Sequence, residues 1–214
     1  MCDRPVRIIQ IVVLLLLVAA SACSPSPEIN ERAFVADIEQ FRTIKNEAME
    51  APDSPIPPAR RRQLLPLAYF APSIDYRVPA SLTASTDHTT IQMPTSTGQL
   101  RQMIRVGRLG FTLKGQQFGL TAFVEAGSPT LDRLFVPFTD MTSGTETYPA
   151  GRYLDLDRTP TGLYIVDFNR AYQPYCYYNP TYDCPYPPRE NRLRVPIRAG
   201  EKMKNAVAPV AATR

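Results

Sequence analysis

Between residues 28 and 50, apolar positions recur at helical spacing. Phe34, Ile38 and Phe41 lie three or four residues apart, and mostly polar side chains surround them. This pattern places the apolar side chains on one face of a helix. We therefore predict an amphipathic helix over Glu28–Glu50. A short second helix is expected over Pro58–Leu65, because proline is tolerated in a first helical turn.

From Leu67 onward, the apolar positions form short runs, and no run of helical period reaches twelve residues. Runs of this length, bounded by turn residues, are typical of β-strands. Lys114-Gly115 and Thr161-Gly162 stand where hairpin turns are expected, because glycine readily adopts a positive φ. The expected strands are Ala68–Phe70, Tyr76–Leu82, Thr89–Met93, Leu100–Phe111, Gly115–Glu125, Leu134–Phe138, Tyr164–Phe168 and Leu193–Ile197.

Many short strands after one helix predict a mainly β fold with an N-terminal helix (α+β), built as an antiparallel β barrel or sandwich. The 214 residues are enough for one domain with a full core, and 44% hydrophobic and 21% charged residues are ordinary globular values. We expect a single globular domain over residues 28–202 and a flexible tail over 203–214.

One segment, Tyr148–Lys202, stands out by its composition. Nine of the 11 tyrosines lie between Tyr148 and Tyr186, and six prolines lie between Pro174 and Pro196. Proline has no backbone N–H, so much of this segment is excluded from regular helix and from central strands. Interactions other than a sheet ladder must therefore hold the segment in place.

The first 22 residues have the pattern of an export signal. Arg4 and Arg7 give a slightly positive start, and Ile8–Ala20 is almost entirely apolar. This run is too short to span a bilayer comfortably, so we predict a signal peptide over residues 1–22. Ala20-Ser21-Ala22-Cys23 resembles the lipobox at which bacterial lipoproteins are cleaved and acylated. The same residues also suit ordinary signal peptidase, which would cut the same bond.

Cysteine usage favours the lipoprotein interpretation. Cys2 leaves with the signal, and Cys176 and Cys184 are spaced to pair as a disulfide, which leaves Cys23 alone. An unpaired cysteine is a liability in an oxidising compartment, whereas an acylated one is not. We therefore expect lipidation on Cys23 and a lipid-anchored tether over residues 23–27. The protein would then be exported from the cytoplasm and anchored to a membrane of the bacterial cell envelope.

Several motifs occur in a fixed order in and just before the tyrosine-rich segment. They are Gly144-Thr145-Glu146-Thr147-Tyr148-x-x-Gly151-Arg152-Tyr153, Asp167-Phe168-Asn169-Arg170-Ala171-Tyr172, Cys176, Cys184-Pro185-x-Pro187-Pro188-x-Glu190-Asn191 and Ala199-Gly200-Glu201-Lys202. Together they resemble the hallmark stretches of a prokaryotic family catalogued as a domain of unknown function, DUF1684. The resemblance covers most of residues 28–202 and implies no particular activity.

Most common catalytic and metal centres are excluded by the residues present. His88 is the single histidine and lies in a polar stretch typical of a solvent-facing loop. The sequence contains no Gly-x-Ser-x-Gly nucleophile elbow, and the spacing of Cys176 and Cys184 is not that of a zinc knuckle. Asp155-Leu156-Asp157 resembles the start of a calcium loop, but Pro160 stands where such a loop needs glycine. We expect no metal and no cofactor.

The motifs nevertheless hold polar residues that suit a site. Glu146, Asp167 and Glu190 are candidate catalytic residues, because paired carboxylates act as acid and base when burial separates their pKa values. Buried carboxylates with arginine and asparagine equally suit a structural network, because an irregular segment lacks ladder partners. The expected members of one such network are Glu146, Asp167, Asn169, Glu190, Arg152 and Arg170. The candidate ligand-binding residues are Arg152, Tyr153, Asn169, Arg170, Tyr172, Tyr175 and Asn191.

Two classes of function follow from these residues. The first is a membrane-anchored cell-envelope lipoprotein that acts as a binding or structural module, because tyrosine stacks on sugars and extended peptides. The alternative is a hydrolase of an envelope polymer or ester that uses a carboxylate pair. The expected partners are a membrane, through the lipid on Cys23, and an envelope glycan, peptide or small molecule. Nucleic acid is not expected, because the net charge of +4 is scattered and Arg60–Arg62 is too short a basic run.

Overall fold

The computed structural model describes residues 30–87, 90–128 and 132–204. Within these ranges, the residues from Arg32 onward form one unit. The expected signal peptide, the tether with Cys23, His88 and residues 205–214 of the expected tail lie outside the described residues. The predictions about them therefore stay predictions.

The predicted amphipathic helix is confirmed as α2 (Glu31–Glu50), and the predicted second helix is confirmed as α3 (Pro58–Leu64). Pro58 begins α3 because its missing N–H would have no partner in a first turn. The remaining helical turns are η1 (Ile74–Tyr76), η2 (Phe168–Arg170), α4 (Tyr175–Tyr178) and η3 (Arg189–Asn191). Among the described residues, no helix is long and apolar enough to cross a membrane.

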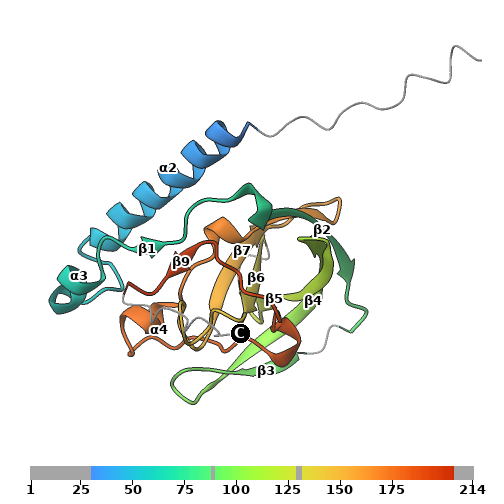
Figure 1. The fold of residues 1–214 in the computed structure, drawn as a ribbon. Coiled ribbons are helices and arrows are strands. Elements are labelled where there is room, and N and C mark those ends of the chain that lie inside the picture. The colour runs from blue at the N-terminus through green and yellow to red at the C-terminus, as the bar shows by residue number, and fades with distance from the viewer. Residues whose placement is uncertain (1–29, 88–89, 129–131, 205–214) are drawn as a thin grey trace, which may run out of the picture. The chain divides into compact units, whose positions relative to one another are not determined.

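Seven strands form one antiparallel sheet that curls into a nearly closed barrel (Figure 1). They are β2 (Arg77–Ala84), β3 (Thr90–Pro94), β4 (Leu100–Leu113), β5 (Gln116–Glu125), β6 (Arg133–Phe138), β7 (Arg152–Asp157) and β8 (Leu163–Asp167). Their order is β7-β6-β5-β4-β2-β8, and β3 pairs with β4. A separate two-stranded sheet consists of β1 (Ala68–Tyr69) and β9 (Glu201–Lys202). The predicted fold class is confirmed.

Strand β4 bends the sheet toward closure. Its first half pairs with β3 and its second half with β2, and its register with β5 shifts between Arg105 and Gly107. Such a bulge bends a strand and increases its twist. Glycine is needed at position 107 because a Cβ atom there would clash with the backbone of Thr83 on β2. The predicted turn at Lys114-Gly115 is confirmed, with φ values of 48° and 78°.

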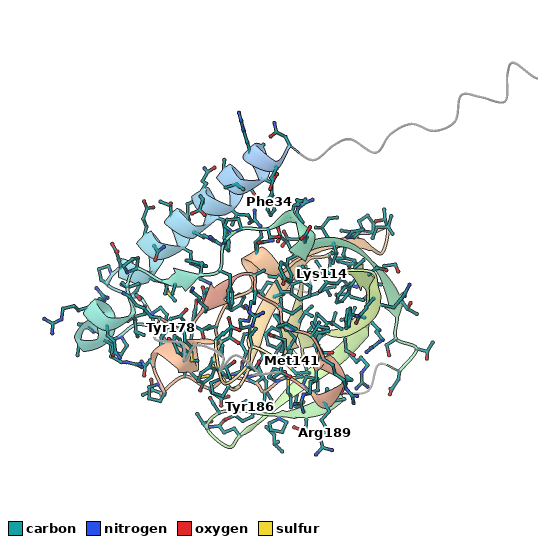
Figure 2. All side chains as sticks on the ribbon, in the orientation of Figure 1. Phe34, Lys114, Met141, Tyr178, Tyr186 and Arg189 are labelled. Carbon is teal, nitrogen blue, oxygen red and sulfur yellow. The ribbon has the colours of Figure 1, made fainter. Side chains whose placement is uncertain are left out.

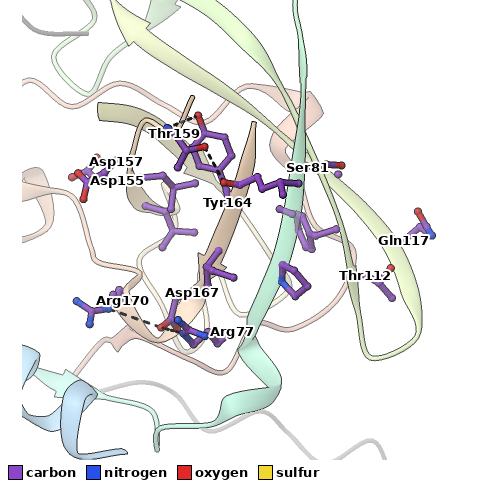
Figure 3. A pocket seen from close by; sticks show the side chains of 18 of the residues that line it. Arg77, Ser81, Thr112, Gln117, Asp155, Asp157, Thr159, Tyr164, Asp167 and Arg170 are labelled. Atoms are coloured by element: carbon purple, nitrogen blue, oxygen red, sulfur yellow. Dashed lines mark hydrogen bonds and ion pairs between the residues drawn. The ribbon is translucent and has the colours of Figure 1, made fainter. Parts of the chain in front are cut away.

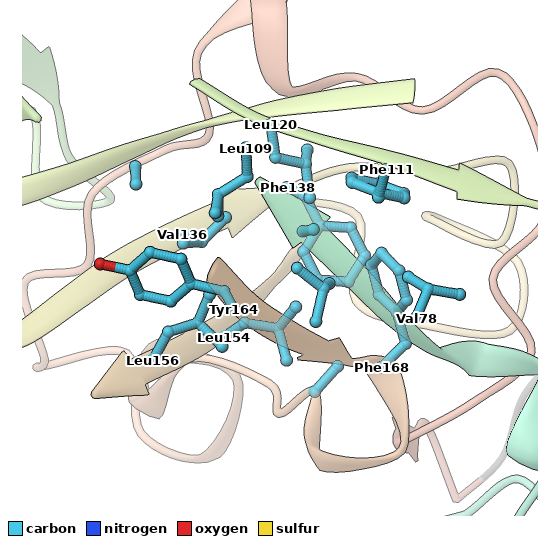
Figure 4. Packing of buried hydrophobic residues seen from close by; sticks show 14 of the residues in the cluster. Val78, Leu109, Phe111, Leu120, Val136, Phe138, Leu154, Leu156, Tyr164 and Phe168 are labelled. Carbon is cyan, nitrogen blue, oxygen red and sulfur yellow. The ribbon is translucent and has the colours of Figure 1, made fainter. Parts of the chain in front are cut away.

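Inward-facing side chains from every strand except β3 fill the barrel (Figure 4). On β7 the alternation is regular: Leu154 and Leu156 are buried, while Asp155 and Asp157 are exposed. Phe168 closes one end of the core, with its ring edge-on to those of Phe111 and Phe138 at 5.8 and 5.4 Å. Burying one such side chain contributes about 1.5–3 kcal/mol, so this core supplies most of the stability.

A second apolar cluster joins the helices to one another. Met49, Ile56 and Leu64 pack with Tyr178 of α4, which is labelled in Figure 2. Polar contacts also fix α2: the guanidinium of Arg42 donates to the carbonyl of Phe70 at 2.8 Å. Helix α2 therefore has a defined position beside the segment that carries α4.

The strand expected over Leu193–Ile197 is wrong. This segment is irregular, because Pro196 removes a ladder donor and no neighbouring strand is available to the rest. Its backbone instead finds separate partners. The Leu193 N–H donates to the carbonyl of Thr139 at 2.8 Å, and the Ile197 N–H donates to Asp140 Oδ1 at 3.1 Å.

The side chain of Arg152 holds this irregular C-terminal segment to the barrel. Its guanidinium is fully buried and donates to the carbonyls of Ile197, Ala199 and Glu201. Nη2 also contacts Asp140 Oδ2 at 3.0 Å, and both side chains of this ion pair are buried. One side chain on β7 thus supplies the hydrogen bonds that a neighbouring strand would otherwise provide.

We expect Arg152→Ala to lower the free energy of unfolding by about 3–5 kcal/mol, because the Asp140 carboxylate is left buried and unpaired. Chemical denaturation measures the change. The matched control is Arg133→Ala, which breaks an exposed ion pair with Asp157 at 3.5 Å and should cost less than about 1 kcal/mol. Equal losses in the two variants would contradict the anchoring role of Arg152.

Candidate functional site

A cavity of about 820 Å³ lies between α2 and the tyrosine-rich segment, and we call it the tyrosine pocket. Its walls are mostly apolar and aromatic, as is usual for sites that bind small ligands. The lining residues are Phe41, Ile44, Lys45, Ala48, Arg101, Met103, Val124, Glu125, Ser128, Arg133, Phe135, Tyr153, Asp155, Tyr172, Tyr175, Tyr182, Asp183, Cys184 and Pro185. Three of the predicted ligand-binding residues, Tyr153, Tyr172 and Tyr175, are among them.

Two of these tyrosines are held rigidly. The backbones of Tyr153 and Tyr172 exchange two hydrogen bonds, at 2.8 and 3.0 Å, and their rings meet edge to face at 5.7 Å. The Tyr153 hydroxyl donates to the carbonyl of Pro185 at 2.6 Å, and its ring packs against that of Phe135. Burial raises the pKa of both tyrosines well above the usual value. These side chains therefore present neutral, preorganised aromatic surface.

Asp155 brings a carboxylate to this aromatic surface. It accepts a hydrogen bond from the Tyr172 hydroxyl at 2.8 Å. Asp155 retains access to solvent, yet the protein atoms around its carboxylate raise its pKa, against the opposing effect of the Tyr172 hydroxyl. Asp155 is thus a carboxylate that protonates more readily than usual.

Lys45 of α2 lies over the same tyrosine. Its Nζ atom is 4.4 Å from the centroid of the Tyr172 ring and 2.7 Å from Glu201 Oε1. The buried Glu201 also accepts hydrogen bonds from the Tyr178 hydroxyl at 2.6 Å and the Gln173 N–H at 2.7 Å. Both hydrogen bonds go to Oε2, and Oε1 has the ion pair with Lys45 as its contact, so Lys45 is already paired in the absence of a ligand.

The outer wall of the pocket carries its most exposed aromatic group. The ring of Tyr175 is 46% exposed and lies edge-on to Tyr182 at 5.3 Å. Beside them, Arg101 forms an ion pair with Asp183 at 3.0 Å and a longer one with Glu125. The charged groups at this wall are thus paired, and the accessible surface is chiefly that of tyrosine.

Cys176 and Cys184 lie side by side at the edge of the pocket as free, buried thiols. The Cys176 N–H donates to Cys184 Sγ at 3.1 Å. Hydrogen bonding from Cys184 lowers the pKa of Cys176 to about 6, and the same interaction raises the pKa of Cys184. The expected disulfide is not formed in this structure, although the loop places the two residues together.

Three predicted ligand-binding residues serve the fold instead. Arg152, Asn169 and Asn191 are completely buried. The amide of Asn191 accepts from the Thr121 N–H and donates to the carbonyls of Thr121 and Pro137, at 2.7–2.8 Å. It thereby joins β5 to β6 where only one residue pair of the ladder forms. Asn169 pairs in the same way with the N–H and carbonyl of Ser73.

The expectation of one polar network is wrong. The expected members divide among separate ion pairs: Glu146 with Arg198, Glu190 with Arg105, Asp167 with Arg77 and Arg170, and Arg152 with Asp140. Figure 3 shows Arg77 and Arg170 on either side of Asp167. Irregular chain between the motifs carries their side chains to different elements, so closeness in sequence does not produce one cluster. Arg170 is 40% exposed, so Arg152, and not Arg170, is the buried cation.

The pocket also contains functional candidates that sequence reasoning missed. Lys45 and Phe41 come from α2, far away in sequence, and Arg101 comes from β4. In the sequence, Asp155 stands out only as the first residue of an incomplete resemblance to a calcium loop. The sequence pattern that could have revealed Asp155 is the alternation of Leu154, Asp155, Leu156 and Asp157. This pattern predicts a strand with both carboxylates on its outer face. The described residues contain no group of three or more His, Cys, Asp or Glu side chains that would hold a metal ion.

The fold and site define a class: an antiparallel β-barrel domain with an aromatic pocket on its outer side. Residues 63–202 match the model of a family described as "Protein of unknown function (DUF1684)", so the chain belongs to this family. It is also similar to an uncharacterized protein of Haloarcula marismortui solved by solution NMR. The identity is 35% and the TM-score 0.64, over 81% of this chain and 96% of that one. No curated protein matches the chain.

We expect Asp155→Asn to change how stability depends on pH. The pKa of Asp155 in the folded protein is raised above the usual 3.8, which applies to the unfolded chain. At pH values between the unfolded and folded pKa, the folded protein therefore binds more protons than the unfolded one. Wild-type stability therefore falls as pH rises through this window. The stability of the variant relative to wild type should rise over the same window and then stay level. Urea unfolding from pH 3 to 8 measures this, with the more exposed Asp157→Asn as control. A difference independent of pH would contradict the raised pKa.

Proposed function

We propose that this protein is a membrane-anchored envelope lipoprotein whose barrel domain binds a ligand in the tyrosine pocket. The observation that carries the proposal is the convergence of Tyr153, Tyr172, Tyr175 and Tyr182 on one cavity. Two of them are fixed by hydrogen bonds, and Tyr175 remains half exposed. Rigid aromatic surface with polar edges binds ligands at low cost in conformational entropy.

The charges around the pocket favour a neutral polar ligand. Lys45 is paired with Glu201, Arg101 with Asp183, and Arg133 with Asp157. A charged ligand would have to compete with these partners, whereas a sugar ring stacks on tyrosine and hydrogen-bonds to Asp155 without displacing them. We therefore propose an envelope glycan as the ligand class ahead of a charged peptide.

The hydrolase alternative needs two carboxylates that face each other across the reacting bond. Glu146, Asp167 and Glu190 are instead engaged by arginines at separate places. None of the three lines the tyrosine pocket. These positions favour the binding module over the enzyme.

Ligand binding can be tested with the eleven tyrosines themselves, because the chain has no tryptophan. We expect uncharged, soluble oligosaccharides of N-acetylglucosamine to change tyrosine fluorescence saturably. Tyr175→Ala should weaken their binding about tenfold, as expected for loss of one aromatic stacking partner. Tyr186→Ala is the matched control, since Tyr186 is 40% exposed and does not line the pocket. Equal affinities for wild type and Tyr175→Ala, or no binding at all, would contradict the proposed pocket.

Export and anchoring make a second prediction. Cys23→Ala should move the protein from the membrane to the soluble fraction, because stable anchoring needs the two or more acyl chains of a processed lipoprotein. Cys2→Ala should leave it in the membrane. A wild-type protein that is soluble, with a free Cys23 thiol by mass spectrometry, would contradict the anchor.

In the oxidising compartment that we propose, Cys176 and Cys184 should form the bond that the structure lacks. Closing this nine-residue loop would stabilise the fold by about 2.6 kcal/mol in the chain-entropy model. Peptide mapping of the envelope-purified protein without reductant would reveal the linked peptide.

A further inference from the structure

The barrel is open along one seam, between β7 and β8. Strand β7 pairs with β6, and β8 pairs with β2, but no ladder joins β7 to β8 within the residues that the structure describes. A cavity of about 1070 Å³ lies here, lined by Leu154–Asp157 of β7 and by Leu163, Tyr164, Ile165 and Asp167 of β8 (Figure 3). The seam therefore holds two strand edges that face one cavity.

The register identifies which backbone groups of β7 face the seam. Tyr153 directs its N–H and carbonyl away from β6, because both are bonded to Tyr172. Backbone groups alternate in direction along a strand, so those of Asp155 and Asp157 point the same way. Tyr172 thus pairs with the start of this edge. The chain reaches Tyr172 from η2 and so does not run along the part of the edge that holds Asp155 and Asp157.

The same reasoning applies to β8. The Leu82 N–H donates to the carbonyl of Gly162 at 2.8 Å, so the backbone carbonyl of Gly162 points toward β2. Because backbone groups alternate in direction, those of Tyr164 and Val166 also point toward β2. Leu163 and Ile165 therefore face the seam. The backbone carbonyl of Leu163 accepts a hydrogen bond from the Thr159 hydroxyl, and its N–H donates to the Thr161 hydroxyl. For Ile165, no hydrogen bond on this side occurs among the described residues.

We propose that the seam binds an extended peptide as an added strand that continues from Tyr172 and runs antiparallel to β7. Exposed strand edges bind peptides in this way, with backbone hydrogen bonds giving affinity and neighbouring side chains giving selectivity. This site is independent of the proposed function, except that Asp155 lines both cavities. Asp157 and Ile165, which line only the seam, therefore serve for its test.

Side chains along the seam define the chemistry of the peptide. Asp155 and Asp157 project from one edge, while Leu163 and Ile165 on the other are 65% and 44% exposed. Arg77 and Arg170 lie at the η2 end, around Asp167. An antiparallel peptide would place its C-terminus near these arginines and its earlier residues beside the aspartates. The seam thus suits a segment of alternating basic and aliphatic residues, whose C-terminal carboxylate would compete with Asp37 and Asp167 for the two arginines.

The experiment uses the purified full-length protein in mild detergent and the acetylated peptide Lys-Val-Lys-Val-Lys-Val with a free C-terminus. We expect the peptide to slow amide exchange of Asp155, Asp157 and Ile165 at least tenfold, as formation of backbone hydrogen bonds predicts. A peptide of the same sequence with every second amide N-methylated should not do so. No slowing at millimolar peptide overturns the proposal.

Two substitutions separate backbone pairing from side-chain contact. Ile165→Pro removes only the N–H that faces the seam and leaves the ladder to β2 intact, so it should weaken binding about fivefold more than Ile165→Ala. Asp157→Asn should weaken binding and reduce its salt dependence; this variant still tests the site if the proline variant does not fold. If light scattering shows a dimer whose seam amides are already protected, the occupant is a second copy and the peptide proposal is wrong.

Discussion

The fold depends on one buried cation. Arg152 projects from β7 and binds the carbonyls of Ile197 and Ala199, which belong to an irregular segment, and the carbonyl of Glu201 in β9. Asp140 balances its charge and binds the Ile197 N–H as well. A planar guanidinium with five donors suits this task better than any other side chain, because its hydrogen bonds are held in a fixed geometry.

The irregular chain between β8 and β9 lines part of both cavities. With residues 197–201 held beside β7, Glu201 is buried where it binds Lys45, Tyr178 and Gln173, and the tyrosine-rich segment is drawn up against α2. The chain also leaves β8 through η2 and forms a backbone bridge to β7 at Tyr172, while no ladder joins β7 to β8 in the described residues, so the barrel stays open at the seam. The tyrosine pocket and the open seam thus both border one irregular chain path.

Polar residues in this segment act mainly as substitutes for strand partners. The amides of Asn169 and Asn191 each offer a donor and an acceptor, the same pair that a neighbouring backbone would offer. Their burial explains why residue types that suggest a binding site belong to the framework here. The accessible surface of the tyrosine pocket is left chiefly to the tyrosines.

The sequence by itself determined the amphipathic helix, most of the barrel strands and the fold class, because these depend on local periodicity and turn chemistry. It also singled out Tyr153, Tyr172 and Tyr175, which line the tyrosine pocket, because tyrosines are concentrated in one proline-rich segment. Only the tertiary structure decided that Leu193–Ile197 is not a strand, that Arg152 binds Asp140, and that Lys45 and Arg101 reach the pocket. These contacts join residues 12 to more than 150 positions apart. No local sequence pattern predicts contacts between residues so far apart, because they depend on how the irregular segment packs against the barrel and the helices.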